Sequence, residues 1–72
     1  MEPHLSPGWY QGNLPAGVLH RLNDSVTVLG GPLSGARGAV ISLIAVHPEP
    51  RYLIELDSGD DVELGQSVLG AA

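Results

Sequence analysis

The residues with the most obvious chemical potential form an acidic loop in the last third of the chain. The loop carries the carboxylates of Asp57, Asp60 and Asp61 around Ser58 and Gly59. Calcium prefers hard oxygen ligands gathered in one loop, which makes a calcium site the first hypothesis. The spacing fits no EF-hand loop, whereas Gly59 can adopt the positive φ of a hairpin turn. The sequence therefore favours a turn here, and we expect neither a metal site nor a cofactor.

Two histidines lie close in sequence to carboxylates and could form acid–base pairs. They are His20 with Asp24, and His47 with Glu49. Catalysis also needs a nucleophile or a third, orienting group, and the sequence marks none near either pair. The chain has no cysteine, so disulfides and thiolate metal sites are excluded. We expect no catalytic residues, and we interpret the protein as a non-enzyme.

Length and charge restrict the class of partner. The 72 residues leave room for one hydrophobic core. Three basic residues against eight carboxylates give a net charge of -5, which repels a phosphate backbone and makes nucleic acid an unfavourable partner. The longest apolar run, residues 39–46, is too short to cross a bilayer, and the first residues lack the pattern of a secretory signal. We expect a soluble, cytoplasmic protein with no membrane contact.

The first 16 residues differ in character from the rest. Three prolines and three further turn residues leave no stretch for a regular element, so residues 1–16 are predicted to form an irregular arm. Trp9 and Tyr10 are the exception within it. Large amphipathic rings usually lie against something, which is either the open end of the domain or a partner.

Residues 17–72 read as a small β domain. Residues 17–22 could form a short strand or one helical turn, and residues 23–25 are a turn signal. Alternating or β-branched runs, bounded by Gly, Pro and Asp, predict four strands, and a short helical turn with a closing fifth strand follows. These segments are residues 26–29, 39–46, 52–56, 62–64 and 65–69. Short strands without a helical period predict an all-β fold, a five-stranded SH3-like barrel that curls to protect its edges.

The central segment, residues 24–40, resembles the KOW motif of NusG-type transcription elongation factors and several ribosomal proteins. The resemblance rests on the spacing of valines and glycines, namely Val26, Val28, Gly31, Gly35, Gly38 and Val40. Gly31 and Gly35 permit the backbone of a wide turn, and Gly38 restarts a strand where a side chain would collide with its neighbour. The resemblance extends over residues 24–69 and implies an SH3-like barrel that contacts RNA, the ribosome or RNA polymerase.

The loop of this KOW-like segment departs from the family in charge. RNA-binding members usually carry Lys or Arg there, whereas this chain has Arg37 as the single charge among apolar and small residues. An apolar loop is typical of a surface that binds protein. We therefore interpret the domain as a non-catalytic module for protein–protein interaction or self-association, with a homo-oligomer as one outcome. The candidate partner contacts are Trp9, Tyr10, Leu29, Pro32, Leu33 and Arg37.

Two alternatives stay open at this point. One is a KOW-type transcription or translation factor, which keeps the glycine spacing but lacks the basic loop. The other is an oligomeric barrel enzyme with a shared central pore, because the chain resembles the plasmid-encoded dihydrofolate reductases in size and barrel type. A single barrel of this length is too small to hold a cleft, so such an enzyme would need several copies.

Overall fold

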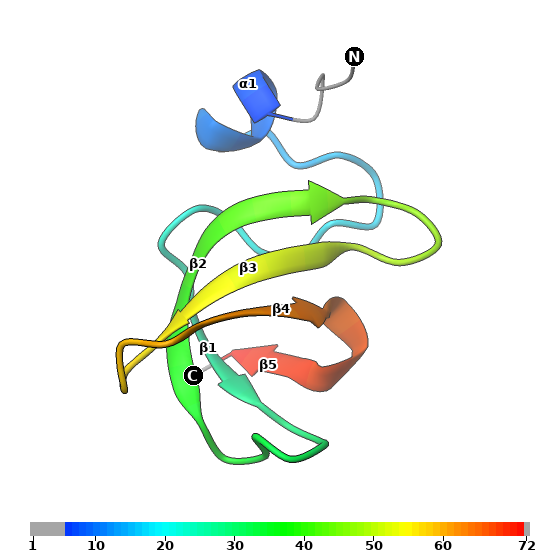
Figure 1. The fold of residues 1–72 in the computed structure, drawn as a ribbon. Helices are drawn as coiled ribbons and strands as arrows, with labels where there is room; N and C mark the ends of the chain where they lie inside the picture. The colour runs from blue at the N-terminus through cyan, green and yellow to red at the C-terminus, as the bar shows by residue number, and fades with distance from the viewer. Residues whose placement is uncertain (1–5, 72) are drawn as a thin grey trace.

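Five antiparallel strands form one sheet in the order β4-β3-β2-β1-β5 (Figure 1). The computed structural model describes residues 6–71. Within this range the elements are α1 (Ser6–Tyr10), β1 (Ser25–Val28), β2 (Arg37–Ala45), β3 (Arg51–Leu56), β4 (Asp61–Gly65), the 3-10 helix η1 (Gln66–Val68) and β5 (Leu69–Ala71). The prediction of an all-β fold with five strands and a short helical turn before the last strand is confirmed.

The sheet is strongly curled, because its two outermost strands are consecutive in the chain. A flat sheet would hold β4 and β5 roughly 19 Å apart, four strand spacings. The three residues of η1 that join them rise only about 6 Å. The bend is concentrated in β2, whose pairing with β3 shifts twice, between Val40 and Ser42 and between Leu43 and Ala45. In the part of the chain that the structure describes, β4 pairs only with β3 and β5 only with β1, so two edges remain.

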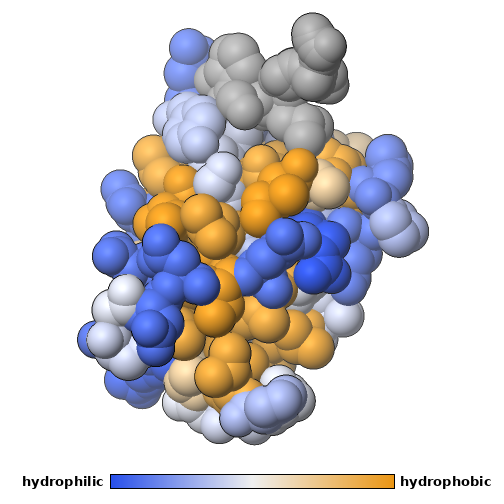
Figure 2. Space-filling view, viewed as in Figure 1, coloured by the Kyte–Doolittle hydropathy of each residue, from blue (hydrophilic) through white to orange (hydrophobic). Residues whose placement is uncertain are grey.

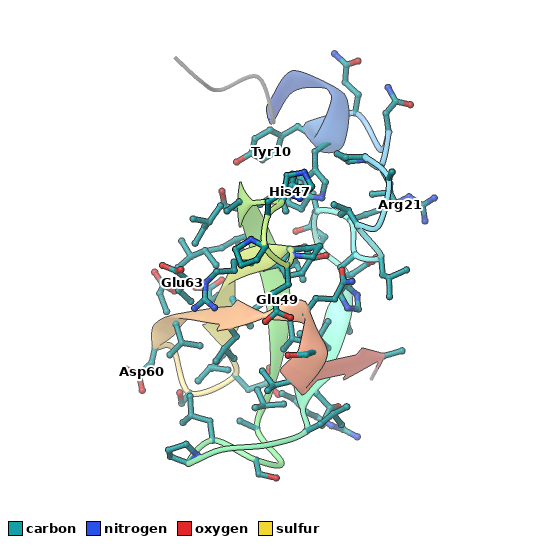
Figure 3. The ribbon with its side chains drawn as sticks, turned by 90° about the vertical axis from the view of Figure 1, so that its right-hand side faces the viewer. Tyr10, Arg21, His47, Glu49, Asp60 and Glu63 are labelled. Carbon is teal, nitrogen blue, oxygen red and sulfur yellow. The ribbon has the colours of Figure 1, made fainter. Side chains whose placement is uncertain are left out.

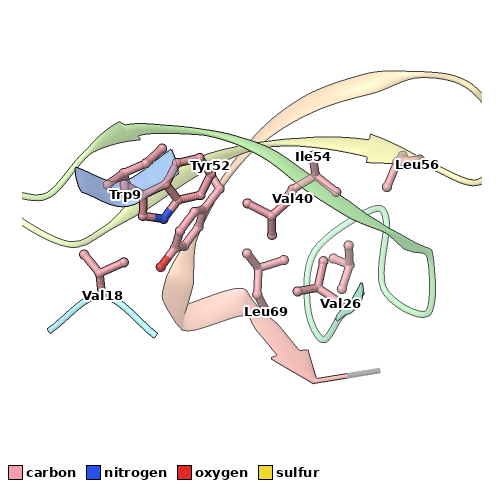
Figure 4. Packing of buried hydrophobic residues seen from close by; sticks show 10 residues of the cluster. Trp9, Val18, Val26, Val40, Tyr52, Ile54, Leu56 and Leu69 are labelled. Atoms are coloured by element: carbon pink, nitrogen blue, oxygen red, sulfur yellow. The ribbon is translucent and has the colours of Figure 1, made fainter. Parts of the chain in front are cut away.

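The inside of the curl is filled by apolar side chains from four of the strands, from the arm and from the segment before β1, and Val62 and Leu64 of β4 pack partly buried against them. Period-two alternation determines which side of each strand contributes: β3 is buried at Tyr52, Ile54 and Leu56 and more exposed between them. The buried set is Trp9, Val18, Val26, Val28, Val40, Leu43, Tyr52, Ile54, Leu56 and Leu69 (Figure 4). Most of the core is therefore aliphatic, and Trp9 and Tyr52 supply its two largest side chains.

The arm is more ordered than its prolines predict. Ser6–Tyr10 is helical, because Pro7 falls in the first turn, where its missing N–H costs no hydrogen bond. The helix ends at a turn in which Gly12 has a φ of 92° and its amide donates to the Trp9 carbonyl at 2.9 Å. The first five residues of the predicted arm lie outside the described residues.

Residues 17–22 form neither the strand nor the helical turn expected of them. Side chains from distant segments satisfy part of their backbone instead. The Trp9 indole Nε1 donates to the His20 carbonyl at 2.8 Å, and the Gln66 side chain bonds both Gly17 and Leu19. The turn predicted at residues 23–25 forms slightly earlier: the Asp24 amide donates to the Arg21 carbonyl at 3.1 Å, Asn23 has a φ of 70°, and Ser25 already begins β1. A segment held by side-chain hydrogen bonds gives no periodic pattern in its own sequence.

Candidate interaction surface

The acidic loop closes the β3–β4 hairpin. Its backbone is held by two hydrogen bonds, from the Leu56 amide to the Asp60 carbonyl and from the Gly59 amide to the Leu56 carbonyl, each 2.8 Å. Gly59 has a φ of 97°, as the turn interpretation requires. All loop side chains are exposed, and within residues 6–71 no three His, Asp or Glu side chains are grouped as a metal would need. The loop therefore acts as a turn that displays negative charge.

The two candidate acid–base pairs have other partners. The Asp24 carboxylate accepts a hydrogen bond from the Arg21 amide at 2.7 Å, and the His20 ring packs edge-on against Tyr52 with centroids 5.3 Å apart. The Glu49 carboxylate accepts from the amide and hydroxyl of Ser67 at 3.1 and 3.2 Å. Both carboxylates thus hold loops in place, and no bond to either histidine is found among the described hydrogen bonds.

The KOW-like turn connects β1 to β2 as a wide, exposed loop. Gly31 and Gly35 have φ values of 79° and 92°, which side chains rarely adopt. The loop is closed by the Gly35 amide donating to the Val28 carbonyl at 2.7 Å. Of its candidate contacts, Pro32 and Arg37 are exposed, whereas Leu33 is half-buried against the core.

Leu29 begins this loop and is 60% exposed. Its side chain lies over β5, because a methyl group added at Gly70 would lie 3.1 Å from Leu29 Cδ1. Its amide donates to the Val68 carbonyl at 2.7 Å. Gly30 also faces Val68, because a methyl group built on Gly30 would lie 4.0 Å from Val68 Cγ1. Leu29, Gly30, Val68 and Gly70 therefore form one continuous uncharged surface, called the Leu29 patch below.

The two aromatic residues of the arm have different positions. Trp9 is only 1% exposed and belongs to the core, so it offers no surface to a partner. Tyr10 packs edge-on against Trp9 at 4.9 Å but is 46% exposed, and its hydroxyl lies 3.3 Å from the Ser42 hydroxyl of β2. Figure 3 shows Tyr10 at the end of the molecule that carries α1. Of the two rings, Tyr10 alone has the exposure that a contact needs.

Sequence reasoning missed the most connected polar residue, Gln66. Its Oε1 accepts hydrogen bonds from the Tyr52 hydroxyl and, at 3.0 Å, from the Leu19 amide; its Nε2 donates to the Gly17 carbonyl at 2.9 Å. Burial raises the pKa of Tyr52 above its usual value, and that usual value already lies well above neutral pH, so the hydroxyl donates. Gln66 thereby ties η1 to β3 and to the segment before β1. A lone glutamine carries no signal of such a role.

Replacing this glutamine is expected to lower the stability. Gln66→Leu keeps the volume but leaves the Tyr52 hydroxyl, the Leu19 amide and the Gly17 carbonyl without their partner, which should cost about 2–3 kcal/mol of unfolding free energy. Urea denaturation followed by circular dichroism measures the loss. Ser67→Ala, one position along, is the control and should cost less than about 1 kcal/mol. Equal losses in the two variants would contradict the role assigned to Gln66.

These features define a small all-β module whose described surface offers loops, an uncharged patch and open strand edges. No enclosed pocket is found in the part of the chain that the structure describes, and none of its helices is both long and apolar enough to span a membrane. No family model, no curated protein and no solved structure matches the chain.

Proposed function

We propose that this chain is a non-catalytic, SH3-like β module that acts by binding protein, either another protein or a second copy of itself. The observation that carries the proposal is the Leu29 patch. Leu29 is 60% exposed, its amide donates to the Val68 carbonyl of η1, and its side chain lies against Gly70 of β5. Uncharged apolar surface on a small soluble domain is typical of an interaction site.

The charge distribution supports protein rather than nucleic acid as the partner. Five of the eight carboxylates fall within residues 55–63, on the β3–β4 hairpin and its acidic loop. Phosphate backbones are bound through several basic contacts, and the KOW-like loop carries Arg37 alone. The positive φ of Gly31 and Gly35 in this loop supports a KOW-type factor as the second candidate, which would contact RNA, the ribosome or RNA polymerase.

The test measures association with and without the patch. The purified chain is expected to form a homo-oligomer in light scattering after size exclusion, or to retain a protein from lysate that mass spectrometry identifies. Leu29→Ser should weaken that association about tenfold, the effect of losing one buried leucine. Ile44→Ser removes an exposed apolar side chain, 41% exposed, from β2 and serves as the control.

Two results would overturn the proposal. One is a monomer that retains no protein. The other is an equal effect of the two substitutions while thermal melts show both variants folded. Salt-sensitive capture of RNA by the unmodified chain would replace protein binding with the nucleic-acid function that the KOW resemblance implies.

A further inference from the structure

The outer edge of β4 is an unpaired strand edge. β4 pairs with β3 along its whole length and with no other described strand. The antiparallel pattern determines which backbone groups are free, because alternate residues of an edge strand point toward and away from their neighbour. The Asp60 carbonyl accepts from Leu56, and the Gln66 amide donates to Pro50. The even-numbered residues of β4 therefore direct their backbone hydrogen bonds toward β3. Asp61 and Glu63 direct their amides and carbonyls toward the free edge.

The side chains along this edge divide by charge between the two faces of the sheet. Val62 and Leu64 lie on the inner face, opposite Ile54 and Tyr52, and are half-buried against the core. Asp61 and Glu63 lie on the outer face and are exposed. In Figure 2 apolar residues extend from the upper to the lower part of this face, and hydrophilic residues border them and interrupt them near the middle. An added strand would meet apolar groups on one face and carboxylates on the other.

The outer face carries an unfavourable charge pair at this edge. Asp61 is directly opposite Glu55 on β3, and like charges directly opposite each other on neighbouring strands destabilise a sheet. Glu63 differs, because Arg51 Nε donates to its carboxylate at 2.7 Å. A positive side chain on a further strand, opposite Asp61, would attract the Asp61 carboxylate and offset its repulsion by Glu55.

We propose that the β4 edge is a strand-addition site for an extended basic segment of another protein. The segment pairs with the free amides and carbonyls of Asp61 and Glu63, places Lys or Arg on the outer face beside Asp61, and places apolar residues beside Val62 and Leu64. A second copy of β4 does not suit this edge, because antiparallel pairing would set the two copies' carboxylates against each other. The inference rests on the proposed protein-binding function and names its partner chemistry.

The experiment uses the acetylated, amidated peptide Thr-Lys-Val-Lys-Val-Lys-Thr as the probe, and its Glu-for-Lys counterpart as the control. Titration into the isotopically labelled full chain is followed by the amide resonances of Asp61 and Glu63. The lysine peptide is expected to shift both resonances and slow their hydrogen exchange, with an affinity that falls as salt rises. The glutamate peptide is expected to shift neither. Asp61→Asn should weaken binding about two- to fivefold, the effect of one exposed ion pair.

A matched pair of variants isolates the backbone contribution. Glu63→Gln and Glu63→Pro both remove the charge and the Arg51 ion pair, but only proline removes the edge amide, at a position where that amide faces solvent and proline is tolerated. Glu63→Gln should bind the lysine peptide, and Glu63→Pro should bind it at least about tenfold more weakly, with melts that show both folded.

Three outcomes would overturn the strand-addition site. They are no amide shift in the unmodified chain, equal binding by Glu63→Gln and Glu63→Pro, and equal binding of the two peptides. A dimer of the unmodified chain that Glu63→Pro dissociates would place a second copy on the edge and would also overturn it. If the peptide does not bind but association still depends on Leu29, the proposed function stands without the strand-addition site. If the peptide binds but association does not depend on Leu29, the Leu29 patch is not part of that function.

Discussion

Gly38→Ala is expected to destabilise the protein strongly. Gly38 is buried in β2 with β1 on one side and β3 on the other. A methyl group there would overlap the Glu55 carbonyl of β3 and lie 2.9 Å from Ile54 Cγ2. Because the obstacle is backbone in the middle of a sheet, it cannot move without breaking strand pairing. We expect a loss of about 3 kcal/mol, a large share of the roughly 4–10 kcal/mol typical of a domain this size.

The matched control is the same substitution at a glycine with space around it. At Gly30 the new methyl would meet only Val68 Cγ1, at 4.0 Å, an ordinary contact. Gly30→Ala should change the unfolding free energy by no more than about 1 kcal/mol, because a non-strained alanine also lowers the entropy of the unfolded chain. Urea denaturation of both variants provides the measurement. Similar midpoints would show that β2 and β3 do not approach closely at Gly38.

Much of the sheet could be predicted because its strands are short and their patterns unambiguous. The alternation of Tyr52, Ile54 and Leu56 with exposed residues sets both the strand and its buried face, and Gly59 marks the hairpin that follows. The spacing of Gly31, Gly35 and Gly38 predicts a wide turn followed by a close strand contact, and both occur at those positions. These signals are local, so neighbouring residues are enough to reveal them.

The features that were not predicted depend on contacts between distant segments. Gln66 forms hydrogen bonds with Leu19 and Gly17, which are 47 and 49 positions away in the chain, and with Tyr52. A polar residue in a short 3-10 helix gives no sign of such distant partners. The free edge of β4 follows from the order of strands in the sheet, which periodicity does not determine. The alternation of charged Asp61 and Glu63 with apolar Val62 and Leu64 is visible in the sequence. That this alternation lies on a free strand edge becomes clear only from the order of strands in the sheet.

The arm illustrates the same limit and leads to the second large effect. Trp9→Ala is expected to cost about 3–5 kcal/mol, the range for deleting a fully buried large aromatic side chain, and so to remove a large share of the stability typical of a domain this size. The indole belongs to the same buried core cluster as Tyr52 and Val18 (Figure 4), and its Nε1 donates to the His20 carbonyl. Trp9→Phe should lose about 1–2 kcal/mol, because it keeps most of the ring but not that hydrogen bond.

The controls separate core packing from a loosely docked arm. Tyr10→Ala, at the adjacent exposed position, should cost less than about 1 kcal/mol. Trp9 is the single tryptophan of the chain, so its fluorescence reports the arm while circular dichroism reports the sheet. If the arm is part of the core, the two signals must change at the same urea concentration in the unmodified protein. A fluorescence change at lower urea would show that the arm separates first, and Trp9→Ala would then leave the sheet folded.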